Sequence, residues 1–437
     1  MSSEVNWTRL TLQQAGVSLI DCDHRTPPAA AEGFPYIAIP QLKDGHVDLN
    51  GARRIAPADY FEWTKKLKPR AHDVIVVRRC NSGDSALVPV GLDCAIGQNL
   101  VVLRSNGAAI EPTFLRWLVR GPDWWDQVAK FINVGAVFDS LRCRDIPNFE
   151  LTVPPLTDQR AIAALLNSLD DRIALLRETN TTLEAIAQTL FQSWFVDFDP
   201  VRAKQQGLAP AGMDEATAAL FPDRFEESTL GLVPKGWSVQ PVGDAVECVG
   251  GATPDTKDQS YWSPEEHAWT TPKDLSGLPA PVLLSTERRL STKGLAKVGS
   301  GLLPVGTLLM SSRAPIGYLA IAQVPVAINQ GYIAMPPGSL LPPLYMLFWC
   351  QQNMEGIKAR ANGSTFMEIS KKAFRPIPAL VPSSLAIKAF MAVASPLFSR
   401  LVSNEHHAQT LTTLRDTLLP RLISGQLRLP DAAALAV

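Results

Sequence analysis

The sequence has few cysteines and histidines, and their spacing argues against a metal site. Its 437 residues include six of each, and no two cysteines form a Cys-x-x-Cys pair. Because a structural zinc site needs ligands that converge at short spacings, we predict no metal site. The first residues do not resemble a signal peptide, and no uninterrupted apolar run reaches about 18 residues, the length that spans a bilayer. These absences predict a cytoplasmic protein with reduced thiols.

The sequence also lacks an excess of charge of either sign. Lysine and arginine number 41 against 42 for aspartate and glutamate, which gives a net charge of −1. Small autonomous DNA-binding domains are more often basic. If this chain binds nucleic acid, its basic residues must be clustered locally, or a partner protein must supply part of the binding surface. Hydrophobic residues make up 46% of the chain, as in ordinary folded proteins, and the length predicts two or three domains.

Motifs that bind nucleotides or assemble catalytic groups are missing as well. The sequence has no Gly-x-x-x-x-Gly-Lys-Ser/Thr loop for ATP, no glycine-rich turn suited to a nucleotide cofactor and no nucleophile elbow. We therefore predict no catalytic residue and no cofactor in this chain.

What the sequence does contain is a duplication, with copies about 228 residues apart. The matched segments are Asp73–Arg79 with Thr307–Arg313, Ala95–Gln98 with Ala327–Gln330, Gly135–Phe138 with Gly363–Phe366, and Val153-Pro154 with Val381-Pro382. Solenoid repeats run about 20–50 residues, so this period indicates two similar globular domains with approximate two-fold symmetry. Some apolar runs have the length of strands, such as Val74–Val77 and Leu100–Leu103, whereas Pro112–Val119 has the apolar spacing of a helix. This mixture predicts α+β domains.

A long amphipathic helix follows each copy. Apolar residues recur at alternating steps of three and four, the heptad pattern of a coiled coil, and an Asn on the stripe fixes register. The first helix, from about 158 to 196, would be about 60 Å long at about 1.5 Å per residue. We predict that the two helices pair antiparallel; the alternative is that each docks on its own domain. The predicted seam consists of Leu169, Ile173, Leu176, Asn180, Leu183, Leu397, Leu401, Asn404 and Leu411.

The predicted fold is therefore α+β, with two similar domains joined by two long helices in an antiparallel coiled coil and a pseudo-two-fold internal repeat. The expected division is a first domain over 1–155, a helix over 156–197, a connector over 198–238, a second domain over 239–383, a helix over 384–427 and a tail over 428–437.

The end of the first long helix resembles a known family. Ser193-Trp-Phe-Val-Asp-Phe-Asp-Pro-Val-Arg-Ala-Lys204, then Leu220-Phe-Pro-Asp223 and Leu232-Val-Pro-Lys-Gly-Trp237, is similar to the central region of type I restriction–modification specificity (S) subunits. Val153–Ile162 is similar to the entry of their first helix. Segments that look like motifs of their target recognition domains are Asp21–Pro27, Ile96–Gln98, Thr271–Leu275, Ser311–Gly317 and Gly363–Phe366.

The resemblance implies a non-catalytic chain whose target recognition domains each read half of a bipartite double-stranded DNA target, with the helices as spacer. It implies docking of two methyltransferase (M) subunits, which restriction (R) motor-nuclease subunits can join; S-adenosylmethionine, ATP and Mg²⁺ would bind to those partners. Trp194 and Phe195 are expected at the docking face. The second helix has Leu422-Ile423 in their place and Ala386-Ile-Lys388 in place of Asp158-Gln-Arg160, so the two faces should be similar rather than identical.

The repeat also supplies candidate DNA contacts. Arg78-Arg79 and Ser312-Arg313 each follow a buried-type strand, and an Arg at a strand end can fork onto guanine O6/N7 or hold a phosphate. Gln98 and Gln330 occupy the next matched turn, and Gln can read adenine. Alternatively, the glutamines tie the backbone of their turns and the arginines pair with nearby carboxylates.

Further basic residues in polar loops are candidate phosphate contacts or, alternatively, solvated surface charges: Lys43, Arg53, Arg54, Lys273, Arg288 and Arg289. His24 and Phe366 are interpreted as local framework. A competing function is a non-DNA coiled-coil scaffold whose two lobes bind protein or carbohydrate. The neutral net charge favours that alternative, and the matched Arg and Gln turns disfavour it.

Overall fold

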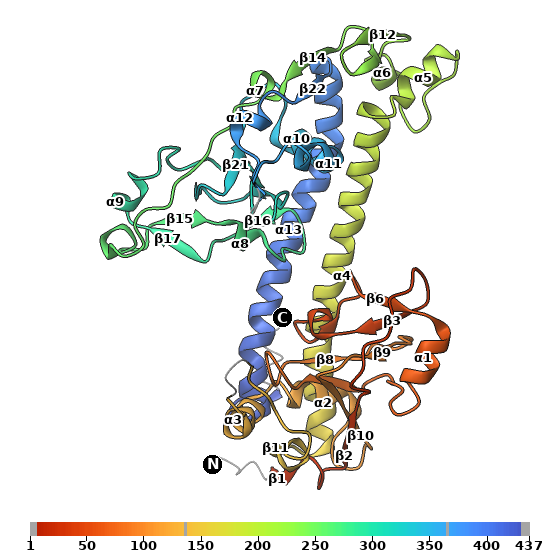
Figure 1. Ribbon diagram of the computed structural model, residues 1–437, viewed down its shortest axis with the longest axis vertical. Helices are drawn as coiled ribbons and strands as arrows, with labels where there is room; N and C mark the ends of the chain where they lie inside the picture. The colour runs from red at the N-terminus through yellow and green to blue at the C-terminus, as the bar shows by residue number, and fades with distance from the viewer. Residues whose placement is uncertain (1–6, 135–137, 364–366, 430–437) are drawn as a thin grey trace. The chain divides into compact units, whose positions relative to one another are not determined.

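The computed structural model describes residues 7–134, 138–363 and 367–429 (Figure 1). Contacts within the chain divide it into two compact units: unit 1 contains residues 1–172 and 410–437, and unit 2 contains residues 173–409. Two helices of 40 residues each, α4 (Leu156–Phe195) and α13 (Ser384–Ile423), contribute to both units.

Unit 1 carries the first lobe, which is built on a six-stranded sheet. The strand order is β2 (Val17–Asp21), β10 (Leu100–Ser105), β7 (Val74–Val77), β8 (Ser85–Leu87), β5 (His46–Val47) and β4 (Leu42–Lys43). A second sheet has the order β6 (Arg53–Ile55), β3 (Phe34–Ile37) and β9 (Ala95–Ile96), and β1 (Thr8–Thr11) pairs with β11 (Glu150–Val153). The helices are η1 (Ile39–Gln41), α1 (Pro57–Trp63), α2 (Pro112–Leu118), α3 (Pro122–Phe131) and η2 (Ile146–Asn148).

The continuous apolar run of β7 follows from burial of both faces of this sheet. Val74 and Val76 belong to one hydrophobic cluster, and Ile75 and Val77 belong to another. Because successive side chains of a strand point to opposite faces, a strand covered on both sides is apolar throughout.

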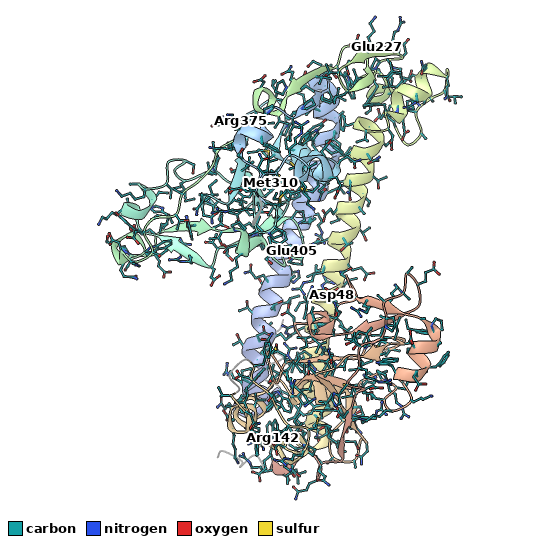
Figure 2. The ribbon with its side chains drawn as sticks, in the orientation of Figure 1. Asp48, Arg142, Glu227, Met310, Arg375 and Glu405 are labelled. Atoms are coloured by element: carbon teal, nitrogen blue, oxygen red, sulfur yellow. The ribbon has the colours of Figure 1, made fainter. Side chains whose placement is uncertain are left out.

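Unit 2 carries the second lobe, in which Met310 of β18 is fully buried (Figure 2). Its main sheet has the order β16 (Val282–Leu283), β19 (Leu319–Ala322), β18 (Leu308–Ser311) and β21 (Tyr332–Met335). A second sheet has the order β17 (Arg288–Leu290), β15 (His267–Thr270) and β20 (Ala327–Ile328), and β14 (Ser238–Pro241) pairs with β22 (Pro378–Val381). The helices are α7 (Val242–Ala245), η3 (Gln259–Tyr261), α8 (Pro272–Leu275), α9 (Thr292–Leu295), α10 (Pro343–Gln352), α11 (Met354–Lys358) and α12 (Lys371–Phe374).

Strand pairing confirms the duplication predicted from the sequence. In the first lobe, β3 lies between antiparallel β6 and parallel β9. In the second lobe, β15 lies in the same way between antiparallel β17 and parallel β20. Of the matched Gly-turn segments, residues 135–137 and 364–366, including Phe366, lie outside the described residues.

The long helices pack antiparallel on one another within each unit. In unit 1, Leu166 of α4 shares a hydrophobic cluster with Leu418 and Leu422 near the end of α13. In unit 2, Phe191, near the end of α4, lies 5.9 Å from Phe390, near the start of α13, between ring centroids. Early residues of one helix therefore meet late residues of the other, as predicted. Each cluster also contains core residues of the lobe, so pairing and docking on the lobe occur together.

Between α4 and the second lobe, the chain of unit 2 forms α5 (Asp199–Gln205), α6 (Glu215–Ala218) and a hairpin of β12 (Phe225–Ser228) and β13 (Gly231–Pro234).

One property of α13 differs from the expectation that no stretch could cross a membrane. By length and composition, this helix is apolar enough to do so. In the structure, however, Ala386, Phe390 and Ala394 of α13 are buried in the core of unit 2. Packing in the core therefore accounts for part of the apolar composition of α13.

Candidate nucleic-acid interface

The first lobe brings its predicted DNA contacts to one edge of the main sheet. Because β10 pairs antiparallel with both β2 and β7, the start of β10 lies at the same edge as the ends of the other two. Arg78-Arg79 directly follow β7, and Gln98 lies in the turn before β10. The Arg78 N–H donates to the Asn99 carbonyl at 2.8 Å and joins the two turns.

The side chains at this edge differ in accessibility. Arg79 is exposed, and its backbone pairs with that of Ser140. Arg78 is half-buried and donates through Nη1 to the Leu141 carbonyl at 3.4 Å. Gln98 is exposed. Arg79 and Gln98 can therefore reach a ligand, whereas Arg78 is directed toward its own lobe.

The second lobe repeats this edge at the end of β18 and the start of β21. The Ser312 N–H donates to the Gly331 carbonyl at 2.8 Å, which matches the bond between Arg78 and Asn99. Gln330 is exposed and accepts a bond from Thr253 Oγ1 at 2.6 Å. Ser312 is 2% exposed, so its side chain cannot contact DNA as expected from the sequence; its role at the edge is through the backbone.

A cavity of about 420 Å³ lies at this second edge. It brings together two of the predicted basic residues, Lys273 of α8 and Arg313. Lys273 Nζ lies 2.8 Å from Glu287 Oε2, and this hydrogen bond raises the pKa of Lys273. The remaining lining residues are Thr271, Pro272, Ser276, Ala314, Tyr318 and Asn329.

The basic pairs of β6 and β17 occupy matching positions but have structural contacts. Arg54 Nη1 donates to the Gly33 carbonyl at 2.8 Å, and Arg289 Nη2 donates to the Glu266 carbonyl at 2.6 Å. Both bonds tie the segment that enters the central strand of the three-stranded sheet. These contacts favour a structural role for the arginines. All four side chains are nevertheless exposed, and phosphate contact remains a prediction.

The neighbouring basic residues also have partners within the chain. Arg53 Nη1 donates to the Pro27 carbonyl at 2.9 Å. The Arg288 guanidinium carbon lies 3.4 Å from the ring centroid of Trp262, a cation–π contact. Lys43 Nζ lies 2.6 Å from Asp48 Oδ2. Phosphate binding by Lys43 would have to displace this carboxylate.

The structure corrects the expectation that Trp194 and Phe195 form a docking face. They are 7% and 5% exposed, inside the aromatic core of unit 2. The Trp194 ring centroid lies 5.1 Å from that of Phe221, and the Phe195 centroid lies 5.3 Å from that of Phe390. The aromatic motif therefore holds the end of α4 against the connector and α13.

A polar contact joins the two long helices inside unit 2. Asn404 Nδ2 donates to Asn180 Oδ1 at 2.9 Å, and Asn180 Nδ2 donates to Glu405 Oε1 at 2.6 Å (Figure 2 labels Glu405 on α13). All three residues are buried. Displacing the helices along one another would leave these groups unpaired, which favours one register. The other predicted seam residues are buried (Leu169, Ile173, Leu176, Leu401) or half-buried (Leu183, Leu397, Leu411).

Sequence reasoning missed a second buried polar contact, in unit 1. The Asp170 carboxylate of α4 accepts from Arg116 of α2 at 2.6 Å and from Arg415 of α13 at 2.5 Å, and His46 of β5 lies 2.8 Å away. Burial alone would raise the pKa of Asp170, but the contact with His46 and the charge of Arg116 outweigh it and hold the pKa well below its ordinary range. This group ties the sheet, α2 and both long helices together.

Another group missed from the sequence is Asp21, Cys22 and His24, whose potential metal-binding atoms lie within 4.8 Å of one another. His24 Nε2 lies 2.9 Å from Asp21 Oδ2, and Lys66 Nζ lies 3.9 Å from the same oxygen. Burial raises the pKa of Cys22 to about 11. Asp21, His24 and Lys66 therefore form a local polar network beside the Cys22 thiol.

Comparisons with known proteins agree with this architecture. A family profile described as "Type I restriction modification DNA specificity domain" matches residues 24–185 and 234–392. The HindI specificity subunit of Haemophilus influenzae is 25% identical over 376 residues, which cover 76% of this chain and 81% of that protein. The MjaIX specificity subunit of Methanocaldococcus jannaschii is 35% identical over 183 residues, or 41% of this chain and 42% of that protein.

Among solved structures, the S subunit of the type I restriction–modification system of M. genitalium has a similar fold, with a TM-score of 0.53 and 16% identity over 97% of each chain. The two profile matches fall on the two lobes, most of α4 and the start of α13, and together they cover most of the chain. This chain therefore belongs to the type I restriction–modification DNA specificity family.

Proposed function

We propose that each lobe of this specificity subunit reads one half of a bipartite double-stranded DNA target. The observation that carries the proposal is the repeated sheet edge. Arg79 and Gln98 in the first lobe correspond to Arg313 and Gln330 in the second, each pair next to an equivalent backbone bond between turns. Two similar edges on one chain suit a target with two halves.

The chemistry of these side chains matches base edges and phosphates. An Arg guanidinium can bind guanine O6 and N7 together or hold a phosphate, and a Gln amide can bind adenine N6 and N7. Exposed basic residues of the lobes, such as Arg54 and Arg289, would neutralise nearby phosphates in a chain with a net charge of −1. We propose the helix pair as the spacer that sets the gap between the half-targets.

The reactions of the complex would belong to its partners. We propose that two methyltransferase subunits dock on this chain and that restriction subunits join them in the cytoplasm. S-adenosylmethionine, ATP and Mg²⁺ would bind to those partners. This division of labour rests on the family and on the absence of nucleotide-binding and catalytic motifs from the sequence.

An exposed stripe on α4 within unit 2 replaces Trp194 and Phe195 as the proposed docking face. Leu175 and Ile186 are 52% and 49% exposed. Thr179 and Thr182 lie between them on the same side of the helix, and their hydroxyls donate to the carbonyls of the preceding turn. The stripe is uncharged and partly apolar, which suits an amphipathic helix of a methyltransferase subunit.

The alternative of a non-DNA scaffold is not favoured, because the chain belongs to a DNA specificity family. The test is DNA binding by the assembled methyltransferase complex with Arg79→Ala or Arg313→Ala, on duplexes changed in one half-target at a time. Each variant should weaken binding. An arginine that contacts guanine bidentately should impair only the half-target read by its own lobe, by about 1–3 kcal/mol, and an arginine that holds a phosphate should weaken binding to all duplexes alike.

Arg9→Ala is the matched control, since Arg9 is an exposed arginine of β1 outside these edges and should change neither half. Unchanged binding and specificity in both Arg79→Ala and Arg313→Ala would show that the edges do not read DNA.

A further inference from the structure

The two edge arginines face different residues across the same backbone contact. Arg79 pairs through its backbone with Ser140, and Arg313 pairs in the same antiparallel manner with Glu368. Ser140 and Glu368 are separated by 228 residues (368 − 140), the separation that relates the Gly-turn motifs of the two copies. The contact is therefore a feature of the repeat, and the residue opposite the arginine is where the lobes differ.

The difference changes the electrostatic environment of each arginine. Arg313 Nη1 lies 3.8 Å from Glu368 Oε2, with the side chains 36% and 43% exposed. Ser140 offers Arg79 no charge, and among the described residues no side-chain hydrogen bond or ion pair involves the Arg79 guanidinium. Lys273, the other cation lining the second-lobe cavity, is also paired, with Glu287.

A carboxylate beside an arginine favours one DNA ligand over another. It offsets the positive charge and repels an approaching phosphate, so the gain from a phosphate contact falls. It also favours guanidinium orientations near the carboxylate, which leave the remaining N–H groups free for the neutral acceptors O6 and N7 of guanine. An arginine without a neighbouring carboxylate has no such bias and is available to phosphate.

We propose that Glu368 is a positioning residue that directs Arg313 to a guanine of the second half-target, whereas Arg79, which faces Ser140, holds a DNA phosphate. This inference rests on the proposed function and assigns different roles to its two arginines. The second lobe would then gain base discrimination from this position, and the first lobe would gain affinity for DNA of any sequence.

The test compares Glu368→Gln with the reciprocal Ser140→Glu in the assembled methyltransferase complex. Binding would be measured at several salt concentrations on the intact target and on duplexes with each guanine of the second half replaced. Glu368→Gln should reduce discrimination at one guanine by about two- to fivefold, the worth of an exposed ion pair. Glu368→Gln should also steepen the plot of log binding constant against log salt concentration, by a slope equivalent to about one released counterion. Ser140→Glu should weaken binding to all duplexes alike. It should also make the same plot shallower, by a slope equivalent to about one released counterion.

The single arginine variants separate this inference from the proposed function. Arg79→Ala should lower affinity for every duplex with a shallower salt dependence, and Arg313→Ala should abolish discrimination at that guanine with little change in slope. Equal salt slopes for both variants, or unchanged discrimination in Glu368→Gln, would overturn the assigned roles while leaving DNA reading intact. Loss of neither affinity nor specificity in the arginine variants would instead overturn the proposed function.

Discussion

Replacing Asp170 with Asn should destabilise unit 1 more than any comparable surface change. The Asp170 side chain is 2% exposed, and its partners Arg116 and Arg415 are 6% and 5% exposed. Asn keeps the shape of the side chain but removes the negative charge between two guanidiniums. The variant therefore isolates the electrostatic contribution of this contact.

The magnitude follows from what remains after the change. Removing one partner of a buried ion pair typically costs about 3–5 kcal/mol, because the other charge stays buried without compensation. Arg415 keeps a second carboxylate partner, Asp416 at 2.8 Å, so Arg116 is the buried charge left without a carboxylate, and we expect Asp170→Asn to cost about 3 kcal/mol. His46, 43% exposed, can be solvated and should add little.

The assay is urea denaturation followed by tryptophan fluorescence. Trp117 is a local reporter, since the Arg116 guanidinium lies 4.5 Å from its ring centroid. Asp171→Asn, at the exposed neighbouring position of α4, is the control and should change stability by no more than about 0.5 kcal/mol. A loss below about 1 kcal/mol for Asp170→Asn would refute the view that this carboxylate compensates the buried arginines.

Three further predictions concern pH and the cores of the helix pair. Because the folded-state pKa of Asp170 is depressed, the ionised carboxylate should stabilise the fold above about pH 4, and this stabilisation should be lost as the pH falls further. Denaturation measured at several pH values should show a smaller loss of stability in acid for Asp170→Asn than for the unchanged protein. Asn180→Leu should destabilise unit 2 by about 1–3 kcal/mol in urea denaturation, since it leaves the buried Glu405 carboxylate without its donor; an equal effect of Thr181→Leu, an exposed neighbour, would contradict this. Trp194→Ala should cost about 3–5 kcal/mol by the same measurement, and a change near zero would argue against its burial.

The features that could be predicted from the sequence are those marked by a repeating pattern of residues or by similarity between two segments. The heptad stripes repeat within each helix, so spacing alone indicated long helices with Asn180 and Asn404 on the contact side. The duplication compares one segment with another and requires no knowledge of packing. Both are confirmed by the fold, including the antiparallel pairing of α4 and α13.

The features that sequence reasoning missed depend on contacts between distant residues. Asp170 and Arg415 are 245 residues apart, and each reads as an ordinary charged position on a helix until the helices are paired. Trp194 resembled an exposed motif residue because the connector that covers it, including Phe221, is not periodic. The guanidinium of Arg54 is directed to a backbone carbonyl, an acceptor that every residue carries and no sequence pattern marks.

The central claim, that two lobes of one chain read two half-targets, is tested most directly by mapping methylated adenines in the host genome with and without the gene for this chain. We predict that one motif loses methylation when the gene is removed, and that this motif has two specified halves separated by a gap of fixed length and unspecified sequence. Unchanged methylation after removal, or loss of a motif whose specified bases are continuous, would contradict it.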